Sequence, residues 1–166
     1  FLHGQSVFVL GCGGAGRAMA ITCADEGASR VVVSDIDAAR ADKVVAEIAE
    51  LFPAVSVESA GTDAVQWVAA SKQADLVVQA TPIGMKQSDT PLLTSEAFRE
   101  GQVLFDLIYM YPETGIMKEA IAGGAQAANG LGMLLHQGAR SFEIWTGTAP
   151  DTTAMRKALE ASVYGS

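Results

Sequence analysis

The stretch Val7–Ala18 constrains the fold more than any other part of the chain. Its first four residues are apolar and run straight into a glycine-rich turn, and a helix-forming run follows at once. Gly11, Gly13 and Gly16 match the G-x-G-x-x-G spacing between a predicted strand and a predicted helix. The first glycine allows a tight turn, the second lets a pyrophosphate approach the backbone, and the third lets helix and strand pack closely.

The residues after this turn complete a dinucleotide-binding pattern. Gly14 and Ala15 lie at the helix start, where free N–H groups and the helix dipole would face phosphates. Residues 30–35 predict a buried second strand that ends in Asp35, 19 residues after Gly16. A carboxylate there can accept hydrogen bonds from an adenosine ribose. The alternative is that the glycines only make a turn and that Asp35 only caps the next helix.

Composition and charge limit the other classes of function. A chain of 166 residues suits one domain, and 49% hydrophobic with 18% charged residues is ordinary for a globular protein. The net charge of −8 comes from scattered acids, which disfavours a nucleic-acid or anionic-membrane surface. No apolar run approaches the roughly 20 residues that cross a bilayer. We therefore expect residues 1–166 to form one soluble dinucleotide-binding domain.

The two cysteines form neither a disulfide framework nor a metal-ligand spacing, so no metal site is predicted and a reducing cytoplasm is the expected setting. Cys12, inside the glycine loop, is either a thiol with a lowered pKa at a helix N-terminus or a small residue tolerated between glycines. The chain opens at Phe1 with neither an initiator Met nor a signal-peptide pattern. We expect it to begin within a longer protein, although Met removal and trimming would look the same.

Strands and helices alternate along the whole chain, which predicts an α/β fold with a doubly wound parallel sheet of Rossmann type in three α/β/α layers. The predicted strands span residues 5–11, 30–35, 55–57, 75–80, 103–109 and 126–128. The predicted helices span residues 15–27, 37–53, a segment capped by Asp63, 114–124, a segment with an apolar stripe (Leu131, Leu134, Leu135, Phe142 and Trp145), and 152–164.

Two positions point to ligands outside the glycine loop. The loop 81–85 follows the central strand at its carboxyl end, the edge where open α/β sheets bind ligands. Met133 and Gln137 are four residues apart and share a helix face that differs from the apolar stripe. Gln137 either reaches a small polar ligand or lies on a solvated polar face.

Four motifs appear in a fixed order: GCGGAGRA at 11–18, QATPIGM at 79–85, DLIY at 106–109 and GLGMLLHQ at 130–137. Together they resemble the C-terminal, cofactor-binding domain of shikimate and quinate dehydrogenases, over nearly all of the chain. The resemblance implies NAD(P)-dependent oxidation of a ring hydroxyl in a cyclohexane or cyclohexene carboxylic acid, or the reverse reduction. Such a reaction belongs to the shikimate pathway of aromatic amino acid biosynthesis or to quinate catabolism, with shikimate and 3-dehydroshikimate or quinate and 3-dehydroquinate as substrates.

The resemblance also implies which residues hold the nicotinamide ring and its ribose, namely Thr81, Pro82, Met85, Leu107, Gly130 and Met133. Backbone groups of Leu107 and Gly130 would fix the carboxamide, and Met133 would pack beside the ring. Tyr109 and Gln137 would contact the substrate. The plainer interpretation makes Tyr109 a strand-end tyrosine with its hydroxyl in water and Met133 a core filler.

The end of the second strand departs from the NADP-using members of the family, many of which resemble Asn-Arg-Thr there. This chain has Ser-Asp-Ile-Asp at 34–37, similar to the NAD-using quinate/shikimate branch. A carboxylate accepts hydrogen bonds from the 2′- and 3′-hydroxyls and repels a 2′-phosphate. We therefore expect NAD rather than NADP, with Asp35 and Ile36 at the adenosine end. Arg40 could still swing toward a phosphate.

A second departure concerns catalysis. The resemblance implies that the proton-transfer lysine and aspartate lie in an N-terminal substrate domain, which we do not expect within residues 1–166. We therefore assign no catalytic residue and expect this chain alone to bind NAD and catalyse little or nothing. A complete protein using Tyr109 or His136 as acid/base is the alternative. Three other classes stay open: a stand-alone NAD-binding or sensing module, an S-adenosylmethionine-dependent methyltransferase, and two-domain dehydrogenases acting on methylene-folate or amino acids.

Overall fold

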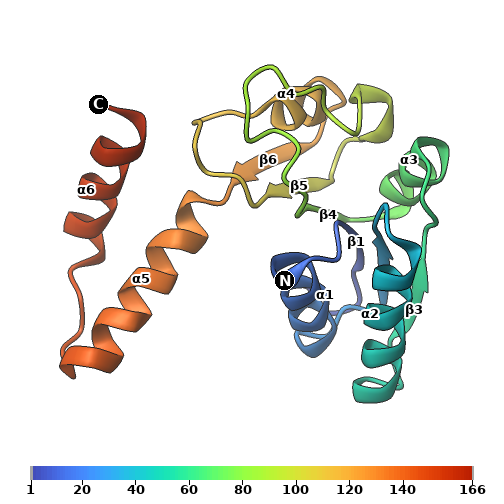
Figure 1. Ribbon diagram of the computed structural model, residues 1–166, viewed down its shortest axis with the longest axis horizontal. Coiled ribbons are helices and arrows are strands. Elements are labelled where there is room, and N and C mark those ends of the chain that lie inside the picture. Colours follow the sequence, from blue (N-terminus) through green and yellow to red (C-terminus); the bar gives the residue numbers. More distant parts are fainter. Residues whose placement is uncertain (1, 166) are drawn as a thin grey trace.

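The computed structural model describes residues 2–165, which contain six strands and six α-helices in the predicted alternation (Figure 1). The strands are β1 (Ser6–Leu10), β2 (Arg30–Ser34), β3 (Ser56–Ser59), β4 (Leu76–Gln79), β5 (Val103–Asp106) and β6 (Gln126–Asn129). The helices are α1 (Gly14–Asp25), α2 (Ala38–Leu51), α3 (Ala64–Gln73), α4 (Gly115–Ala122), α5 (Leu131–Thr146) and α6 (Thr152–Tyr164), with a short 3₁₀ turn, η1 (Ser95–Ala97).

The strands form one parallel sheet in the order β3-β2-β1-β4-β5-β6. The chain builds outward from β1 to β3, returns to the middle, and then builds outward from β4 to β6. The order of connection therefore reverses between β1 and β4, which makes this the switch point where open α/β sheets place their ligands. The predicted fold class, a Rossmann-type doubly wound sheet, is confirmed.

The alternating side chains of each strand supply two hydrophobic cores, one on each face of the sheet. On one face, Val7, Val9, Val31 and Val33 pack against α1 and α2. On the other, residues of α3, η1 and α4 pack against the strand side chains Phe8, Val32, Val77 and Leu104. Because helices cover both faces of the sheet, the central strands are apolar at nearly every position in the sequence. The result is the expected three-layer arrangement.

The helix starts divide into two kinds. At four of them the preceding side chain accepts a hydrogen bond from a first-turn N–H, which satisfies a donor that the helix leaves free; these caps are Asp37, Asp63, Thr114 and Asp151. By contrast, the residues before α1 and α5 are Gly13 and Gly130, which have no side chain to do so; the first N–H of α5 bonds instead to the side chain of Asn129. The uncapped start of α1 faces the carboxyl edge of the sheet.

Apart from shifts of one or two residues at the ends of elements, three details differ from the sequence prediction. The predicted strand 103–109 ends at Asp106, because the carboxylate of Asp106 accepts the N–H of Ile108 and turns the chain away from the ladder. The turn η1 was not predicted. The predicted stripe of α5 is buried only at its start, since Phe142 is 42% and Trp145 is 82% exposed.

The position of α5 explains that exposure. Figure 1 shows α5 leading away from β6 and α6 returning beside it, so that the two helices form an arm that stands off the sheet. Along α6, none of the described residues is fully buried. The far end of the arm therefore lacks a covering layer within residues 2–165.

Candidate functional site

The glycine loop has the backbone geometry that its spacing predicts at two positions. Gly11 has a φ of +100°, a conformation that side chains disfavour. A Cβ on Gly16 would lie 1.8 Å from the carbonyl oxygen of Gly11, so only glycine lets α1 pack this closely on the turn. Gly13 and Gly14 are different: a Cβ on either would meet no atom within 4 Å. Packing within the described chain therefore requires glycine at positions 11 and 16 and does not require it at positions 13 and 14.

The start of α1 opens onto two pockets that share a wall. The Asp35 pocket, of about 360 Å³, has Gly11, Asp35, Ile36 and Arg40 in its lining. The Tyr109 pocket, of about 350 Å³, is lined by the start of α1 and by the loops after β4 and β5, including Gly14, Ala15, Met85, Leu107 and Tyr109. Gly13 and residues 80–82 line both pockets. The two pockets therefore form one cleft across the switch point, with the helix start at its middle.

Asp35 lies buried in the first half of the cleft, with 6% of its surface exposed. Its Oδ2 accepts the N–H of Cys12 at 2.8 Å and its Oδ1 accepts that of Asp37 at 2.9 Å. The guanidinium of Arg40 lies 3.3 Å from both oxygens. Burial alone would raise the pKa of Asp35, but these hydrogen bonds and the Arg40 charge outweigh it and hold the pKa below its usual range. An ionised carboxylate therefore ties β2 to the glycine loop.

These contacts decide two of the open alternatives. The cap of α2 is Asp37, which accepts the N–H of Ala39, so Asp35 does not serve as the helix cap. Ile36 is 83% exposed at the rim of the Asp35 pocket. Cys12 is buried, and burial together with the Asp35 charge raises its pKa to about 11. The thiol is therefore a small buried group, and the lowered pKa considered from the sequence is wrong.

The loop after β4 is shaped by a residue that the sequence did not single out for this role. Gln79 is buried at the end of β4, and its Oε1 accepts the N–H of Thr81 at 2.8 Å. Its Nε2 donates to the carbonyl oxygens of Thr81 and Ile83. Three backbone groups of the loop are thus bonded to one amide. This arrangement presents Thr81 and Pro82 to both halves of the cleft and Met85 to the second half.

The loop after β5 forms the other wall of the Tyr109 pocket. Leu107 and Tyr109 line it, with Tyr109 half-buried. Gly130 lies behind this wall: its N–H donates to the carbonyl oxygen of Ile108, and a Cβ there would lie 2.2 Å from that of Leu107. The structure therefore brings Leu107 and Gly130 into contact, although Gly130 does not line the pocket.

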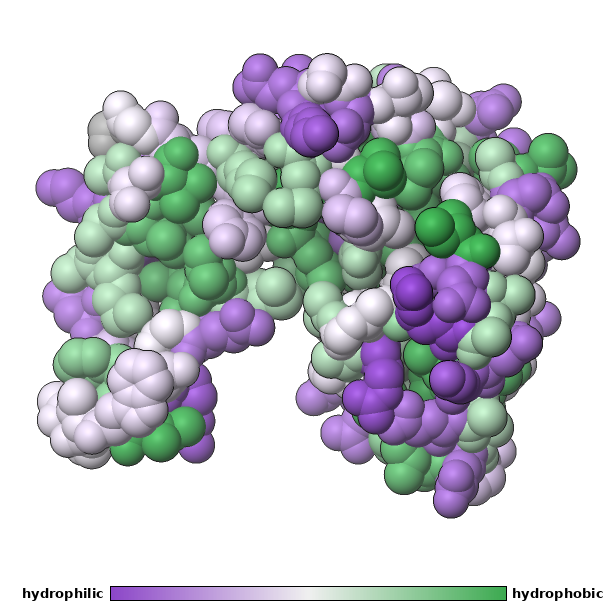
Figure 2. Space-filling view, in the orientation of Figure 1, coloured by the Kyte–Doolittle hydropathy of each residue, from purple (hydrophilic) through white to green (hydrophobic). Residues whose placement is uncertain are grey.

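The structure does not bring the two predicted α5 residues to the cleft. Met133 is half-buried, Gln137 is exposed, and neither lines the pockets described above. The physical reason is the course of α5, which leaves the sheet at β6. Figure 2 shows a deep hollow between the α5–α6 arm and the body of the molecule. The roles implied for Met133 and Gln137 therefore stay predictions.

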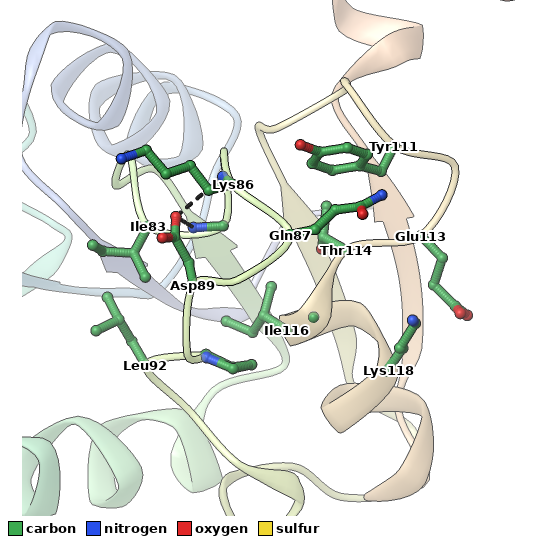
Figure 3. Close-up of a pocket in the computed structure, with 13 residues that line it drawn as sticks. Ile83, Lys86, Gln87, Asp89, Leu92, Tyr111, Glu113, Thr114, Ile116 and Lys118 are labelled. Carbon is green, nitrogen blue, oxygen red and sulfur yellow. Dashed lines mark hydrogen bonds between the residues drawn. The ribbon is translucent and has the colours of Figure 1, made fainter. Parts of the chain in front are cut away.

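A third pocket, of about 310 Å³, lies beyond the loop after β4 and was not predicted (Figure 3). Tyr111, from the loop after β5, donates its hydroxyl to the carbonyl oxygen of Met85 at 3.0 Å. Asp89 accepts the N–H groups of Gly84 and Lys86, and these bonds hold its pKa below the usual range. The Tyr111 bond joins the two loops that also form the Tyr109 pocket, and the Asp89 bonds fix the loop after β4 internally.

Within residues 2–165, no helix combines the length and the apolar character needed to span a bilayer.

Comparisons with known proteins agree with this geometry. Residues 130–160 match the family model described as the Shikimate 5'-dehydrogenase C-terminal domain. The shikimate dehydrogenase (NADP(+)) of Methanopyrus kandleri is 36% identical over 159 residues, which cover 95% of this chain and 54% of the relative. The chain thus spans about half the length of the curated relatives it matches.

Solved structures of dehydrogenases also match this chain. Shikimate 5-dehydrogenase from Listeria monocytogenes, in complex with shikimate and NAD, matches with a TM-score of 0.86 at 28% identity, over 96% of this chain and 57% of that one. Quinate dehydrogenase from Corynebacterium glutamicum, in complex with NAD, matches with a TM-score of 0.82 at 31% identity, over 93% and 54%. These similarities do not favour the methyltransferase alternative. Motifs, fold and relatives together show that the chain belongs to the shikimate dehydrogenase family, of which it forms the C-terminal domain.

Proposed function

We propose that this chain binds a nicotinamide dinucleotide along the cleft. In this proposal it serves a dehydrogenase that transfers hydride to or from the ring hydroxyl of a shikimate- or quinate-type acid. The observation that carries the proposal is the uncapped start of α1 at the junction of two pockets of similar size. A dinucleotide has the same layout, with two nucleoside halves joined by a pyrophosphate. Backbone N–H groups at a helix N-terminus bind such phosphates well.

The two open glycines support this fit. Packing within the described chain does not require glycine at Gly13 or Gly14, because a Cβ on either would meet no atom within 4 Å. Gly13 also has a φ of −67°, which any residue can adopt. A pyrophosphate lying against this backbone would exclude side chains at both positions. The helix start therefore has the bare surface that the phosphates need.

The two halves of the cleft differ in the chemistry that they offer. In the first, Asp35 and Ile36 would hold the adenosine ribose and the adenine. In the second, Thr81, Pro82 and Met85 would line the nicotinamide and its ribose, and the backbone of Leu107 would fix the carboxamide with help from Gly130. The bound nicotinamide would supply the hydride acceptor or donor. The chain's own contribution is to bind and orient this group beside Tyr109.

We propose NAD as the preferred cofactor, although many relatives carry NADP(+) in their names. A 2′-phosphate beside Asp35 would also approach Asp37, so it would meet two carboxylates. Arg40 already lies 3.3 Å from Asp35 and 3.6 Å from Asp37. Recruiting Arg40 to the phosphate would break both ion pairs. The carboxylates therefore disfavour NADP, and NAD can instead donate its ribose hydroxyls.

Calorimetric titration of this chain with NAD and with NADP tests the proposal. We expect clear NAD binding and weaker NADP binding, and Asp35→Asn should reduce the NAD preference by roughly 10-fold or more, the scale of a charged hydrogen bond. Asp37→Asn is the matched comparison and should reduce the NAD preference less, because asparagine still caps α2 and the half-exposed carboxylate of Asp37 is screened by water. Binding of neither dinucleotide would overturn the function, and an unchanged ratio in Asp35→Asn would overturn the role of Asp35.

We further propose that the proton-transfer groups and most of the substrate contacts come from a separate substrate domain. Relatives about twice as long as this chain support this view, as does the hollow beside the α5–α6 arm (Figure 2). The exposed Phe142, Ile144 and Trp145 would then lie against that domain, and Met133 and Gln137 would approach the cofactor and the substrate from α5. Absorbance of NADH with quinate or shikimate should show no turnover by this chain alone. Turnover would place the acid/base within it.

A further inference from the structure

The last residues of β4, β5 and β6 form a polar row across the sheet. Gln79 pairs in register with Asp106, and Asp106 pairs with Asn129. Side chains at paired positions of parallel strands point to the same face. Two residues earlier on each strand, the same face carries the hydrophobic core. The core therefore ends, at the carboxyl edge, in three side chains that can form hydrogen bonds.

Asp106 joins the two ends of the segment 107–113. Its Oδ1 accepts the N–H of Ile108 at 3.1 Å, and its Oδ2 accepts the hydroxyl of Thr114 at 2.6 Å. Thr114 in turn accepts the N–H of Met117 and so caps α4. Asp106 has no exposed surface, and Thr114 has 2%. Both the first turn of the segment and its return into α4 are thus fixed to one buried carboxyl.

Asn129 holds the middle of the same segment. Its Nδ2 donates to the carbonyl oxygens of Tyr111 and Pro112, at 2.9 and 3.2 Å. Its Oδ1 accepts the N–H of Leu131 at the start of α5. The segment 107–113 contains neither helix nor strand, so these side chains provide bonds that regular structure would otherwise provide.

The segment lines only one half of the cleft. Residues 107–110 form a wall of the Tyr109 pocket and have no place in the lining of the Asp35 pocket. We propose that Asp106, Thr114 and Asn129 are positioning residues that set the nicotinamide half of the cleft without touching the cofactor. The inference rests on the proposed function. A residue that only stabilises the whole fold would affect ligand binding in both halves of the cleft alike, whereas a positioning residue of this segment would affect the nicotinamide half alone.

Thr114→Val and Thr114→Ser provide a matched pair. Valine keeps the volume and removes the hydroxyl that Asp106 accepts and that caps α4, whereas serine retains the hydroxyl. The binding of this chain to ADP, which fills only the adenosine half, and to NADH is measured by calorimetry. The fluorescence of bound NADH reports the nicotinamide environment separately.

We expect Thr114→Val to weaken NADH binding about 10-fold or more and to change ADP binding less than about twofold, since small misplacements at a binding surface are costly. Thr114→Ser should restore most of the NADH affinity. Equal losses for both ligands, or no loss, would overturn the positioning role. If Thr114→Val does not fold, Asn129→Ala at a half-buried position must show the same selective loss, and its absence would overturn the inference. A wild-type chain that binds neither ligand, or ADP alone, would instead mean that the proposed function fails.

Discussion

Two buried aspartates, one in each half of the molecule, show how differently the ends of the cleft are built. Asp35 follows β2 and accepts two backbone N–H groups beside a guanidinium. Asp106 ends β5 and accepts one N–H and one hydroxyl, both from uncharged partners. The pKa of Asp35 lies below its usual range, whereas burial raises that of Asp106. The surroundings of Asp35 therefore stabilise its ionised form, whereas those of Asp106 disfavour ionisation while its oxygens hold the loop after β5.

The surroundings of each aspartate differ in the same way. The Asp35 half is shaped by backbone conformation, since Gly11 and Gly16 give the turn its form within a few residues. The Tyr109 half is shaped by side chains that reach across the sequence, as when Asn129 bonds to Tyr111. We therefore expect the first half to respond to changes at glycines. The second half should respond to changes at buried polar side chains.

The largest effect is expected at Gly16. In Gly16→Ala the new Cβ would overlap the carbonyl oxygen of Gly11, which is backbone and cannot move aside, so we expect a loss of about 3 kcal/mol or more in the free energy of unfolding. Gly14→Ala is the control, because its Cβ meets open space; it should be neutral or stabilising by up to about 1 kcal/mol. Urea denaturation measures both. Similar losses in the two variants would contradict the distinction between the glycine pairs.

The two aspartates should have pH effects of opposite sign. The folded pKa of Asp35 lies below the ordinary value of about 3.9, so its stabilisation is present above that pH and is lost as the pH falls toward the folded pKa. The folded pKa of Asp106 lies above the ordinary value, so the fold holds the proton more tightly than the unfolded chain does. The stability that it contributes therefore falls as the pH rises from about 4 toward the folded pKa.

Urea denaturation of Asp35→Asn and Asp106→Asn, from about pH 3 to about pH 7, checks these signs. Relative to the variant, the wild-type chain should gain stability with rising pH in the first comparison and lose it in the second. Asparagine keeps the size of each side chain and removes its titration. It also replaces one acceptor oxygen with an NH2 group, which lowers the stability by an amount that does not vary with pH, so the slopes still report the titration. If the stability difference between wild type and variant changed with pH in the same direction for both aspartates, their environments would not differ as the structure indicates.

The smallest effect is expected at Tyr164, whose hydroxyl lies 2.8 Å from the Nδ2 of Asn129 and links the end of α6 to β6. Tyr164→Phe removes this one hydrogen bond at a half-buried position, so the free energy of unfolding should fall by about 1 kcal/mol or less. Hydrogen exchange should become faster in α6 and stay unchanged in α1. Faster exchange throughout the molecule would mean that the arm and the body unfold as one unit.

Much of the fold and one half of the site could be predicted because the signals are local. The alternation of apolar runs with helical periods predicts the order of the elements, and the glycine spacing with Asp35 predicts where β1, α1 and β2 meet. The strand prediction failed at residues 107–109. There the pattern of apolar residues continues, but a bond from Ile108 to Asp106 ends the strand.

The sequence by itself determined the alternating α/β order, the glycine turn and the acid after β2. These depend on the conformations that each residue type allows within a few positions. Only the tertiary structure decided that Gln79, Asp106 and Asn129 stand in one row, because strand register sets which polar side chains become neighbours. It also decided that α5 leaves the sheet with Trp145 exposed. An apolar stripe predicts a helix, but only the packing of distant segments decides which surface covers it.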